Sequence, residues 1–468
     1  MKATDMNCVI THPTGSYAHK GLYPTLRFVT TLIILTLTAT MAWAANSDAT
    51  TLSTGIDDAP PLYEEATDWT TLKSLVEAGG TVKLTNDVTR NVDEVNVDEV
   101  IEVTKAVTLD LNGHTIYGYE TGSSTLYNNT PIFSVYEGGN LTITDGSAGK
   151  GGKITNVWGT SAIYVGGTDD SHYGKATFEA GTIASGGVYI YNYGKFTMTG
   201  GTINTEGDDS GVIVDENATF TMTGGTITGN YIGVDIKFAS STFTVSGQVN
   251  ITGNTEHDVS LVYYKNTFTP IHIDGPLAPT ARIGVWTGKD VSGINGKTFT
   301  EGLNGNGSKA NFVSNNNDLE VVVVTNMETM SGELAFEPRM FITAHQATFN
   351  GVTKYWATFY SSNNYRLPEG SQAFYIKGDD HALYLLGDGD LIPDNFGVII
   401  MSDTDKIGLD KTDQGCDKPG DNKLKGTNSS TPASSLGSNV YVLSEGDGGL
   451  GFYKFTGEIP AHRAYYVE

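Results

Sequence analysis

Residues 173–183 read Tyr-Gly-Lys-Ala-Thr-Phe-Glu-Ala-Gly-Thr-Ile, and two later stretches repeat this unit. Residues 193–203 read Tyr-Gly-Lys-Phe-Thr-Met-Thr-Gly-Gly-Thr-Ile, and residues 217–227 read Asn-Ala-Thr-Phe-Thr-Met-Thr-Gly-Gly-Thr-Ile, so the unit recurs after 20 and then 24 residues. Each copy alternates apolar and polar residues as a strand does and then turns at glycine. A repeat of this length predicts one coil of a parallel β-solenoid. Because one copy cannot bury its apolar side alone, the copies must stack.

Two apolar ladders follow from the alternation, because successive side chains of a strand point to opposite faces. The first ladder is predicted to point inward and pairs Leu141 with Ile143, Ala176 with Phe178, Phe196 with Met198, Phe220 with Met222, and Phe243 with Val245. The intervening residues Thr142, Thr177, Thr197, Thr221 and Thr244 are predicted to point outward. A second ladder pairs Ile163 with Val165, Val188 with Ile190, Val212 with Val214, and Val234 with Ile236. A third sheet is only weakly visible.

The composition indicates an extracellular all-β protein. Only 17% of the 468 residues are charged, whereas the chain has 57 glycines and 24 tyrosines, and this length is sufficient for two domains. The net charge of −25 argues against nucleic acid and anionic membranes as partners, because both require basic patches.

The N-terminus is predicted to be a signal peptide of residues 1–44. Lys20 and Arg27 precede the apolar run 28–37, and Ala42-Trp-Ala44 supplies a cleavage site of small residues. The alternative is a retained membrane anchor, but the run is shorter than the about 20 residues of a spanning helix. We therefore expect a secreted mature chain without a membrane-spanning segment.

The remaining chain divides into four parts. Residues 45–62 are small, polar and proline-containing, which predicts a disordered leader. A parallel β-helix is predicted for 63–326, a linker for 327–338 and a C-terminal β module for 339–468. A helix is expected from the N-cap Asp68 to the glycines at 79–80, where it either covers the open end of the first coil or is an unrelated surface helix.

Two segments carry a family resemblance. The helix, Gly79-Gly-Thr-Val-Lys-Leu84 and Val107-Thr-Leu-Asp-Leu-Asn-Gly-His-Thr-Ile116 together resemble the opening coils of pectate-lyase-like right-handed β-helix proteins, particularly bacterial surface proteins. Residues 367–375, 392–398 and 459–465 each read as an aliphatic-proline pair, a polar turn and a strand. These segments resemble the C-terminal β-sandwich-like module of Bacteroidales surface proteins. The resemblance implies a location on the cell surface of a Gram-negative bacterium.

The same resemblance raises the alternative of a polysaccharide lyase or glycoside hydrolase. Hydrolases need paired carboxylates, which Asp208 and Asp209 could supply, but the surrounding polygalacturonase-like pattern is missing, so a solvated turn is favoured. Calcium-dependent lyases use an arginine or lysine base, yet no arginine occurs between residues 91 and 281. Lys175 and Lys195 occupy equivalent places in adjacent repeats, which favours a solvating role. No catalytic residue, metal site or cofactor is predicted.

A row of tyrosines indicates recognition instead. The outward positions of the second ladder are Tyr164, Tyr189 and Tyr191, with Tyr193 just beyond them. Exposed rings offer apolar faces against which sugar rings stack. The alternative is that loops cover these rings or that the tyrosines merely flank the turn. The sequence therefore predicts a cell-surface adhesive or structural protein whose partners are glycans or other surface components.

Overall fold

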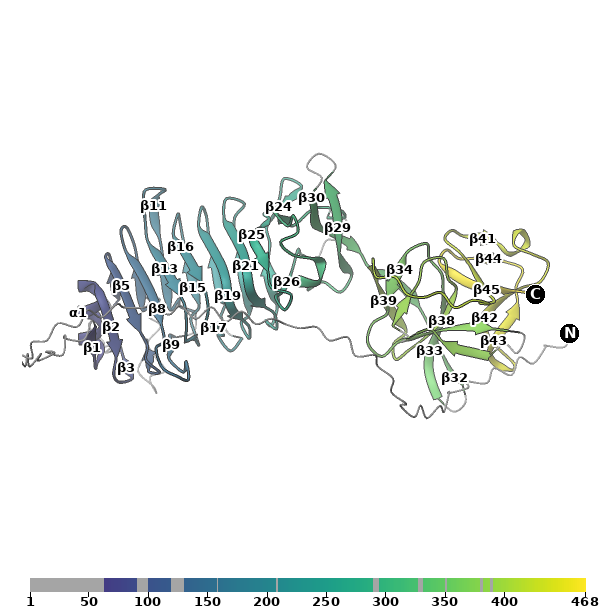
Figure 1. The fold of residues 1–468 in the computed structure, drawn as a ribbon, viewed down its shortest axis with the longest axis horizontal. Coiled ribbons are helices and arrows are strands. Elements are labelled where there is room, and N and C mark those ends of the chain that lie inside the picture. Colours follow the sequence, from purple (N-terminus) through teal and green to yellow (C-terminus); the bar gives the residue numbers. More distant parts are fainter. Residues whose placement is uncertain are drawn as a thin grey trace, which may run out of the picture.

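The computed structural model describes residues 63–90, 100–118, 130–157, 159–207, 209–288, 294–326, 331–349, 352–378, 382–387 and 390–468. The expected signal peptide and leader lie outside the described residues. The described chain is all-β, with many short strands and one α-helix. Strands of the N-terminal part stack side by side along the long axis of the molecule, and the C-terminal strands lie at the other end (Figure 1).

A parallel sheet of 17 described strands organises the N-terminal part. Its strands are β1 (Glu64–Ala66), β2 (Gly80–Leu84), β3 (Val88–Thr89), β5 (Ala106–Asp110), β6 (Thr115–Tyr117), β8 (Asn140–Thr144), β9 (Lys153–Thr155), β13 (Lys175–Phe178), β14 (Thr182–Ile183), β16 (Lys195–Met198), β17 (Thr202–Ile203), β19 (Thr219–Ile227), β21 (Thr242–Ile251), β25 (Ile271–Leu277), β26 (Arg282–Val285), β27 (Thr300–Glu301) and β28 (Phe312–Ser314). Their stacking is compatible with the parallel β-helix expected from the repeat.

The predicted register of the first ladder is confirmed. Phe196 pairs with Phe220 and Phe220 with Phe243, and all three side chains are buried. Their rings stack with centroids 5.5 and 5.1 Å apart. Thr197 and Thr221 pair on the opposite face and are partly exposed. The repeat therefore places one apolar residue directly above the next from coil to coil.

A third ladder, only weakly visible in the sequence, is built from the Thr-Ile ends of the repeat. It consists of aligned and buried isoleucines: Ile116, Ile154, Ile183, Ile203, Ile227, Ile251 and Ile283. In the three copies of the repeat, a glycine with a positive φ stands at the turn before the Thr-Ile pair. Gly201, for example, has a φ of 74°, and a Cβ atom there would lie 2.5 Å from the Phe178 ring. The repeated Gly-Thr-Ile is thus a turn followed by a core residue.

The second ladder forms a separate parallel sheet of seven described strands. In spatial order they are β4 (Ile101–Val103), β7 (Phe133–Val135), β10 (Ile163–Val165), β15 (Val188–Ile190), β18 (Val212–Val214), β20 (Ile232–Ile236) and β22 (His257–Ser260). The predicted inward pairs of the second ladder are buried and in register, which confirms the phase of the alternation.

Helix α1 (Trp69–Ala78) lies where the sequence predicted a helix. The Asp68 carboxylate accepts a hydrogen bond from the Thr71 N–H, and Gly79 ends the helix with a φ of 87°. Trp69, Leu72 and Val76 are buried in the same apolar cluster as the inward residues of the parallel sheets.

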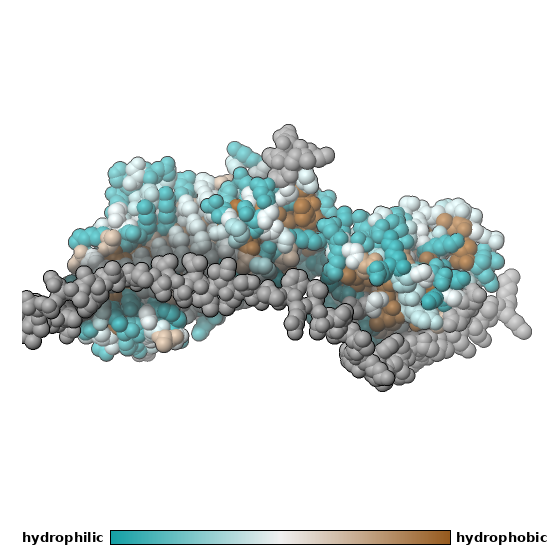
Figure 2. Space-filling view, viewed as in Figure 1, coloured by the Kyte–Doolittle hydropathy of each residue, from teal (hydrophilic) through white to brown (hydrophobic). Residues whose placement is uncertain are grey.

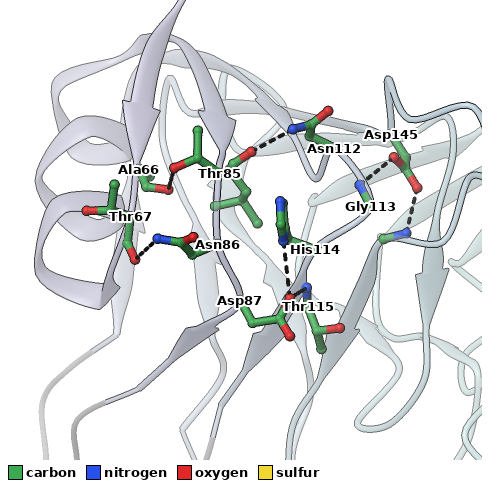
Figure 3. A network of polar contacts seen from close by, with 12 residues as sticks. Ala66, Thr67, Thr85, Asn86, Asp87, Asn112, Gly113, His114, Thr115 and Asp145 are labelled. Carbon is green, nitrogen blue, oxygen red and sulfur yellow. Dashed lines mark hydrogen bonds and ion pairs between the residues drawn. The ribbon is translucent and has the colours of Figure 1, made fainter.

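Polar turn residues connect successive coils (Figure 3). The Asp145 carboxylate accepts hydrogen bonds from the N–H groups of Gly113, Ser147 and Gly152, at 2.9, 3.0 and 2.6 Å. Asn112 donates from its side-chain amide to the carbonyl of Leu84 at 3.0 Å. These side chains therefore give partners to main-chain groups both within one turn and between neighbouring turns.

Burial acts to raise the pKa of Asp145, but the hydrogen bonds from Ser147, Gly152 and Gly113 outweigh it and hold the pKa below its usual value. The ionised form is therefore the one that fits this turn.

The C-terminal strands form antiparallel sheets. One sheet contains β31 (Met340–Thr343), β39 (Lys406–Thr412), β34 (Asn364–Arg366) and β37 (Leu391–Ile392), and a second contains β32 (His345–Phe349), β33 (Val352–Phe359), β38 (Val398–Ser402), β35 (Gln372–Lys377) and β36 (Ala382–Leu385). A third contains β40 (Leu424–Thr427), β45 (Arg463–Val467), β42 (Val440–Gly446) and β43 (Gly449–Lys454), and a short pair joins β41 (Thr431–Pro432) to β44 (Glu458–Ile459). Their apolar residues form buried clusters apart from the first core.

The remaining elements are short hairpins and 3-10 turns. The hairpins pair β11 (Gly167–Asp169) with β12 (His172–Tyr173), β23 (Tyr263–Tyr264) with β24 (Thr267–Phe268), and β29 (Leu319–Asn326) with β30 (Ser331–Pro338). The 3-10 turns are η1 (Lys309–Asn311) and η2 (Ala433–Ser435).

The boundary between the two parts differs from the linker expected at 327–338. Residues 331–338 form β30, which pairs along its whole length with β29. Leu334 and Phe336 are buried in the first core, where the Phe336 ring stacks on Phe299 at 4.3 Å. Acidic and small residues surround the apolar ones, so the periodicity of the sequence does not reveal this strand. Contacts with distant residues bury its three apolar side chains, Leu334, Ala335 and Phe336.

The two parts meet through polar contacts that β39 makes with β29, with η1 and with Arg339. The buried Glu320 side chain accepts a hydrogen bond from the Lys411 N–H at 2.6 Å, and Lys309 donates to the Lys411 carbonyl, also at 2.6 Å. Arg339 forms an ion pair with Asp410 at 2.8 Å. The C-terminal strands are therefore held against the end of the parallel sheets by specific groups.

Glu320 makes this contact sensitive to pH. Burial raises the pKa of Glu320 to about 7, and the negative charge of Asp410 adds to the rise. The hydrogen bond from the Lys411 N–H and the positive charges of Lys309 and Arg339 act in the opposite direction. Because the folded pKa lies above the ordinary value of 4.5, this group favours the folded state at acidic pH, and that contribution is lost as the pH rises through about 7.

We therefore expect Glu320→Gln to melt at nearly the same temperature as the unsubstituted protein at pH 5 and several degrees higher at pH 8.5. Glutamine keeps an oxygen acceptor for the Lys411 N–H without the buried charge. Thermal unfolding at the two pH values checks this, with the exposed Glu301→Gln as the matched control. A constant difference between variant and parent at both pH values would contradict it.

Candidate functional site

The tyrosine row lies on the outer face of the seven-stranded sheet. Tyr164 of β10 pairs with Tyr189 of β15, which pairs in turn with Ile213 of β18 and then Asp235 of β20. Strand alternation places these residues on the face opposite the buried ladder. Tyr191 follows the end of β15 and is 41% exposed.

A fourth ring, which the sequence analysis did not select, belongs to the same cluster. Tyr136 follows β7 and is 43% exposed, and its ring centroid lies 5.5 Å from that of Tyr164. Gly166 makes room for it, because a Cβ atom there would lie 2.9 and 3.0 Å from the rings of Tyr164 and Tyr136. The signal was available in the sequence, since Tyr136 stands one residue after an inward valine, as Tyr191 stands one residue after Ile190.

The rings stack on one another along the row. Tyr164 and Tyr189 have centroids 5.6 Å apart with an angle of 21° between the ring planes, and Tyr189 and Tyr191 have centroids 6.3 Å apart at the same angle. Tyr164 and Tyr189 are half-buried. The inner two rings therefore turn their faces toward their neighbours, whereas Tyr136 and Tyr191 are the most exposed rings of the cluster.

Burial raises the pKa of the two inner tyrosines of the row, Tyr164 and Tyr189. Besides burial, a hydrogen bond to Tyr136 adds to the rise in the pKa of Tyr164. The Tyr189 hydroxyl donates to the Asp215 carboxylate. A phenol is already neutral at neutral pH, so these two hydroxyls act there as neutral hydrogen-bonding groups.

Tyr193, the last residue of the predicted set, has a different setting. It lies in the turn after β15 with a φ of 67° and is half-buried. The ring contacts found among the described residues join the other four tyrosines and do not include Tyr193. The structure therefore brings together three of the four predicted residues and adds Tyr136.

Charged groups border the row. At one end, the buried Asp235 carboxylate forms an ion pair with the exposed ammonium of Lys237. At the other, Thr168 of the β11–β12 hairpin donates to the Glu137 carboxylate at 2.9 Å. The surface thus combines aromatic rings, hydroxyls and carboxylates, which together suit a ligand with both apolar C–H groups and hydroxyls.

The residues considered for catalysis lie elsewhere. Asp208 is outside the described residues. Asp209 is partly buried, and its carboxylate accepts a hydrogen bond from the Gly159 N–H at 3.0 Å, so it holds a turn in place. Lys175 and Lys195 pair across adjacent coils as predicted, and the Lys195 ammonium lies 4.0 Å from the centroid of the Tyr173 ring. Lys195 therefore packs against the neighbouring coil.

Comparisons of the chain with protein-family models, with curated proteins and with solved structures give no match. Within the ranges that the structure describes, no helix is long and apolar enough to cross a membrane. In the same ranges, no group of three or more His, Cys, Asp or Glu side chains is arranged to hold a metal ion.

Proposed function

We propose that this chain is a secreted cell-surface protein in which a right-handed parallel β-helix carries a glycan-binding row of tyrosines. In this proposal α1 covers the open end of the first coil, and the C-terminal strands form a separate β module. The role is adhesive or structural. The observation that carries it is the cluster of Tyr136, Tyr164, Tyr189 and Tyr191 on one outer face.

Three features support the architecture. Parallel pairs continue through successive coils with buried residues in register. Helix α1 buries its apolar face on the first strands, where an uncovered coil would expose apolar side chains and an unpaired edge. The C-terminal strands have apolar clusters of their own. The surface location rests on the predicted signal peptide and on the resemblance to Bacteroidales surface proteins.

The tyrosine row supports a glycan as the ligand for a physical reason. Tyrosine offers a rigid apolar ring and a hydroxyl, so it can contact both the C–H groups and the hydroxyls of a sugar at a small cost in side-chain entropy. Repetition from coil to coil extends this surface along one direction, as a chain of sugar units requires. The nearby carboxylates of Glu137, Asp215 and Asp235 favour neutral over acidic sugars, because like charges repel.

We expect a glycan array probed with residues 45–468 to give hits among neutral glycans, and we expect Tyr136→Ala with Tyr191→Ala to abolish them. These two rings are the most exposed of the cluster, so the double variant should melt within a few degrees of the parent. Because ring contacts and not charge provide the affinity, added salt should have little effect.

The control is Tyr264→Ala. This tyrosine is 54% exposed and lies on the β23–β24 hairpin, outside the row. A second variant, Tyr164→Ala with Tyr189→Ala, tests the inner rings. Because these rings are half-buried, a thermal melt of this variant must show that it is still folded before its glycan binding is compared with the parent. Hits that survive in the Tyr136 and Tyr191 double variant would place the glycan site elsewhere on the protein.

A further inference from the structure

A second candidate site lies in the C-terminal part, between the sheet that contains β33 and the sheet that contains β42, β43 and β45. It is a cleft of about 440 Å³, which is within the usual range of small-molecule sites. Hydrophobic residues reach the surface at several places in this part of the molecule (Figure 2). The sequence analysis used residues 459–465 for the family resemblance but selected no residue of this cleft as a functional candidate.

Apolar side chains form part of the cleft, beside polar ones such as His345 and Ser444. Trp356 of β33 forms one side, and Leu443 and Leu450 of the β42–β43 hairpin line it together with Phe455. Leu443 and Leu450 are only half-buried, although both pack against the apolar cluster around Trp356. The two sheets therefore leave apolar side chains partly uncovered, and an apolar ligand would gain free energy by covering them.

One cation reaches this cleft. Arg463 of β45 is half-buried, and its guanidinium donates to the carbonyls of Thr358 at 3.2 Å and Thr343 at 3.3 Å. Two carbonyls orient the group but do not neutralise its charge, and guanidinium has five N–H donors. Burial lowers the pKa of Arg463, and no carboxylate of the described residues offsets this effect.

Two other arginines of the described chain form ion pairs, the exposed Arg282 donates to main-chain carbonyls, and the buried Arg90 donates to Thr130 and Pro131. Arg339 forms an ion pair with Asp410, and Arg366 forms one with Asp390. In a chain with a net charge of −25, a half-buried arginine without such a partner is costly unless an anion binds it. Planar guanidinium is well suited to bind carboxylate through two parallel hydrogen bonds.

We propose that this cleft binds a small organic carboxylate with an apolar body, with the carboxylate on Arg463 and the body between Trp356 and the β42–β43 hairpin. Glu445 and Glu458 also line the cleft, and both are exposed. Their position at the rim disfavours ligands with several negative charges, so the ligand class is a monocarboxylate. This site is independent of the tyrosine row.

The test is calorimetric titration of the full chain with three probes that share one apolar body, namely octanoate, octanol and octylammonium. We expect octanoate to bind at least about tenfold more tightly than octanol, as a charge-assisted pair should provide, and octylammonium to bind most weakly. Arg463→Gln should reduce the octanoate affinity to that of octanol and leave octanol binding unchanged. Arg282→Gln is the matched control, since Arg282 also donates to main-chain carbonyls but lies on β26.

A second variant keeps the proposal testable if Arg463→Gln does not fold. Ser444→Trp adds a large ring at an exposed position that lines the cleft, so it should abolish binding of octanoate and octanol while the melting temperature stays nearly constant. Equal affinity for the three probes, no binding of any probe, or full binding by either cleft variant would overturn the proposal.

Discussion

Replacing Phe220 with alanine is expected to lower the free energy of unfolding by about 3–5 kcal/mol. Phe220 is fully buried, and its ring lies between those of Phe196 and Phe243 in the coils on either side. Truncation leaves a cavity that close-packed neighbours cannot fill, and two ring contacts are lost at the same time. Because each coil depends on the next, the loss should affect several coils.

Thr221→Ala is the matched control for this prediction. Thr221 is the next residue in the same strand but points to the partly exposed face, so its replacement should change the free energy of unfolding by less than about 0.5 kcal/mol. Chemical denaturation of the two variants measures the difference. Equal destabilisation at the two positions would mean that the strand is one residue out of phase, since such a slip exchanges every inward and outward side chain.

The second large effect is expected for Asp145→Asn, which should cost about 2–4 kcal/mol. One carboxylate oxygen of Asp145 accepts from the N–H groups of Gly113 and Ser147, and the other accepts from Gly152. Figure 3 shows the contact with Gly113. An asparagine amide supplies only one acceptor oxygen, so its NH₂ group must face an N–H donor. At least one of the three N–H donors then loses its partner.

The pH dependence of this effect has a defined sign. The folded pKa of Asp145 lies below its usual value, because hydrogen bonds from Ser147, Gly152 and Gly113 outweigh the effect of burial. Its contribution to stability is therefore present above the unfolded pKa of about 3.9 and is lost as the pH falls through the folded pKa. The gap in unfolding free energy between parent and variant should be widest at neutral pH and narrow toward pH 3.

Denaturant unfolding at pH 7 and at pH 3 measures the difference in unfolding free energy between parent and variant at each pH. The exposed Asp274→Asn removes a carboxylate from the same parallel sheets and should have little effect at either pH. If Asp145→Asn were as mild as Asp274→Asn at pH 7, the carboxylate would not be required at this turn.

Some of the candidate site could be predicted from the sequence and some could not. The strand period of two places Tyr164 and Tyr189 on the face opposite Ile163 and Ile190, so their outward direction is a local property. Which rings pack against one another is not a local property, because it depends on residues of other strands. Tyr136 enters the cluster because it lies one coil away over Gly166, and Tyr193 leaves it because its backbone turns into the left-handed region.

The repeat by itself determined the parallel stacking of coils and the register of the ladders. Its apolar residues recur at the same place in every unit, and only one phase buries all of them, as Phe196, Phe220 and Phe243 show. Tertiary structure alone decided the rest. Glu320 became a buried group at the contact with β39, β30 replaced an expected linker, and Arg463 came to lie in a partly apolar cleft between two sheets. The physical reason is that a repeat encodes contacts between neighbouring coils in its own spacing, whereas these three features depend on contacts between segments that share no period.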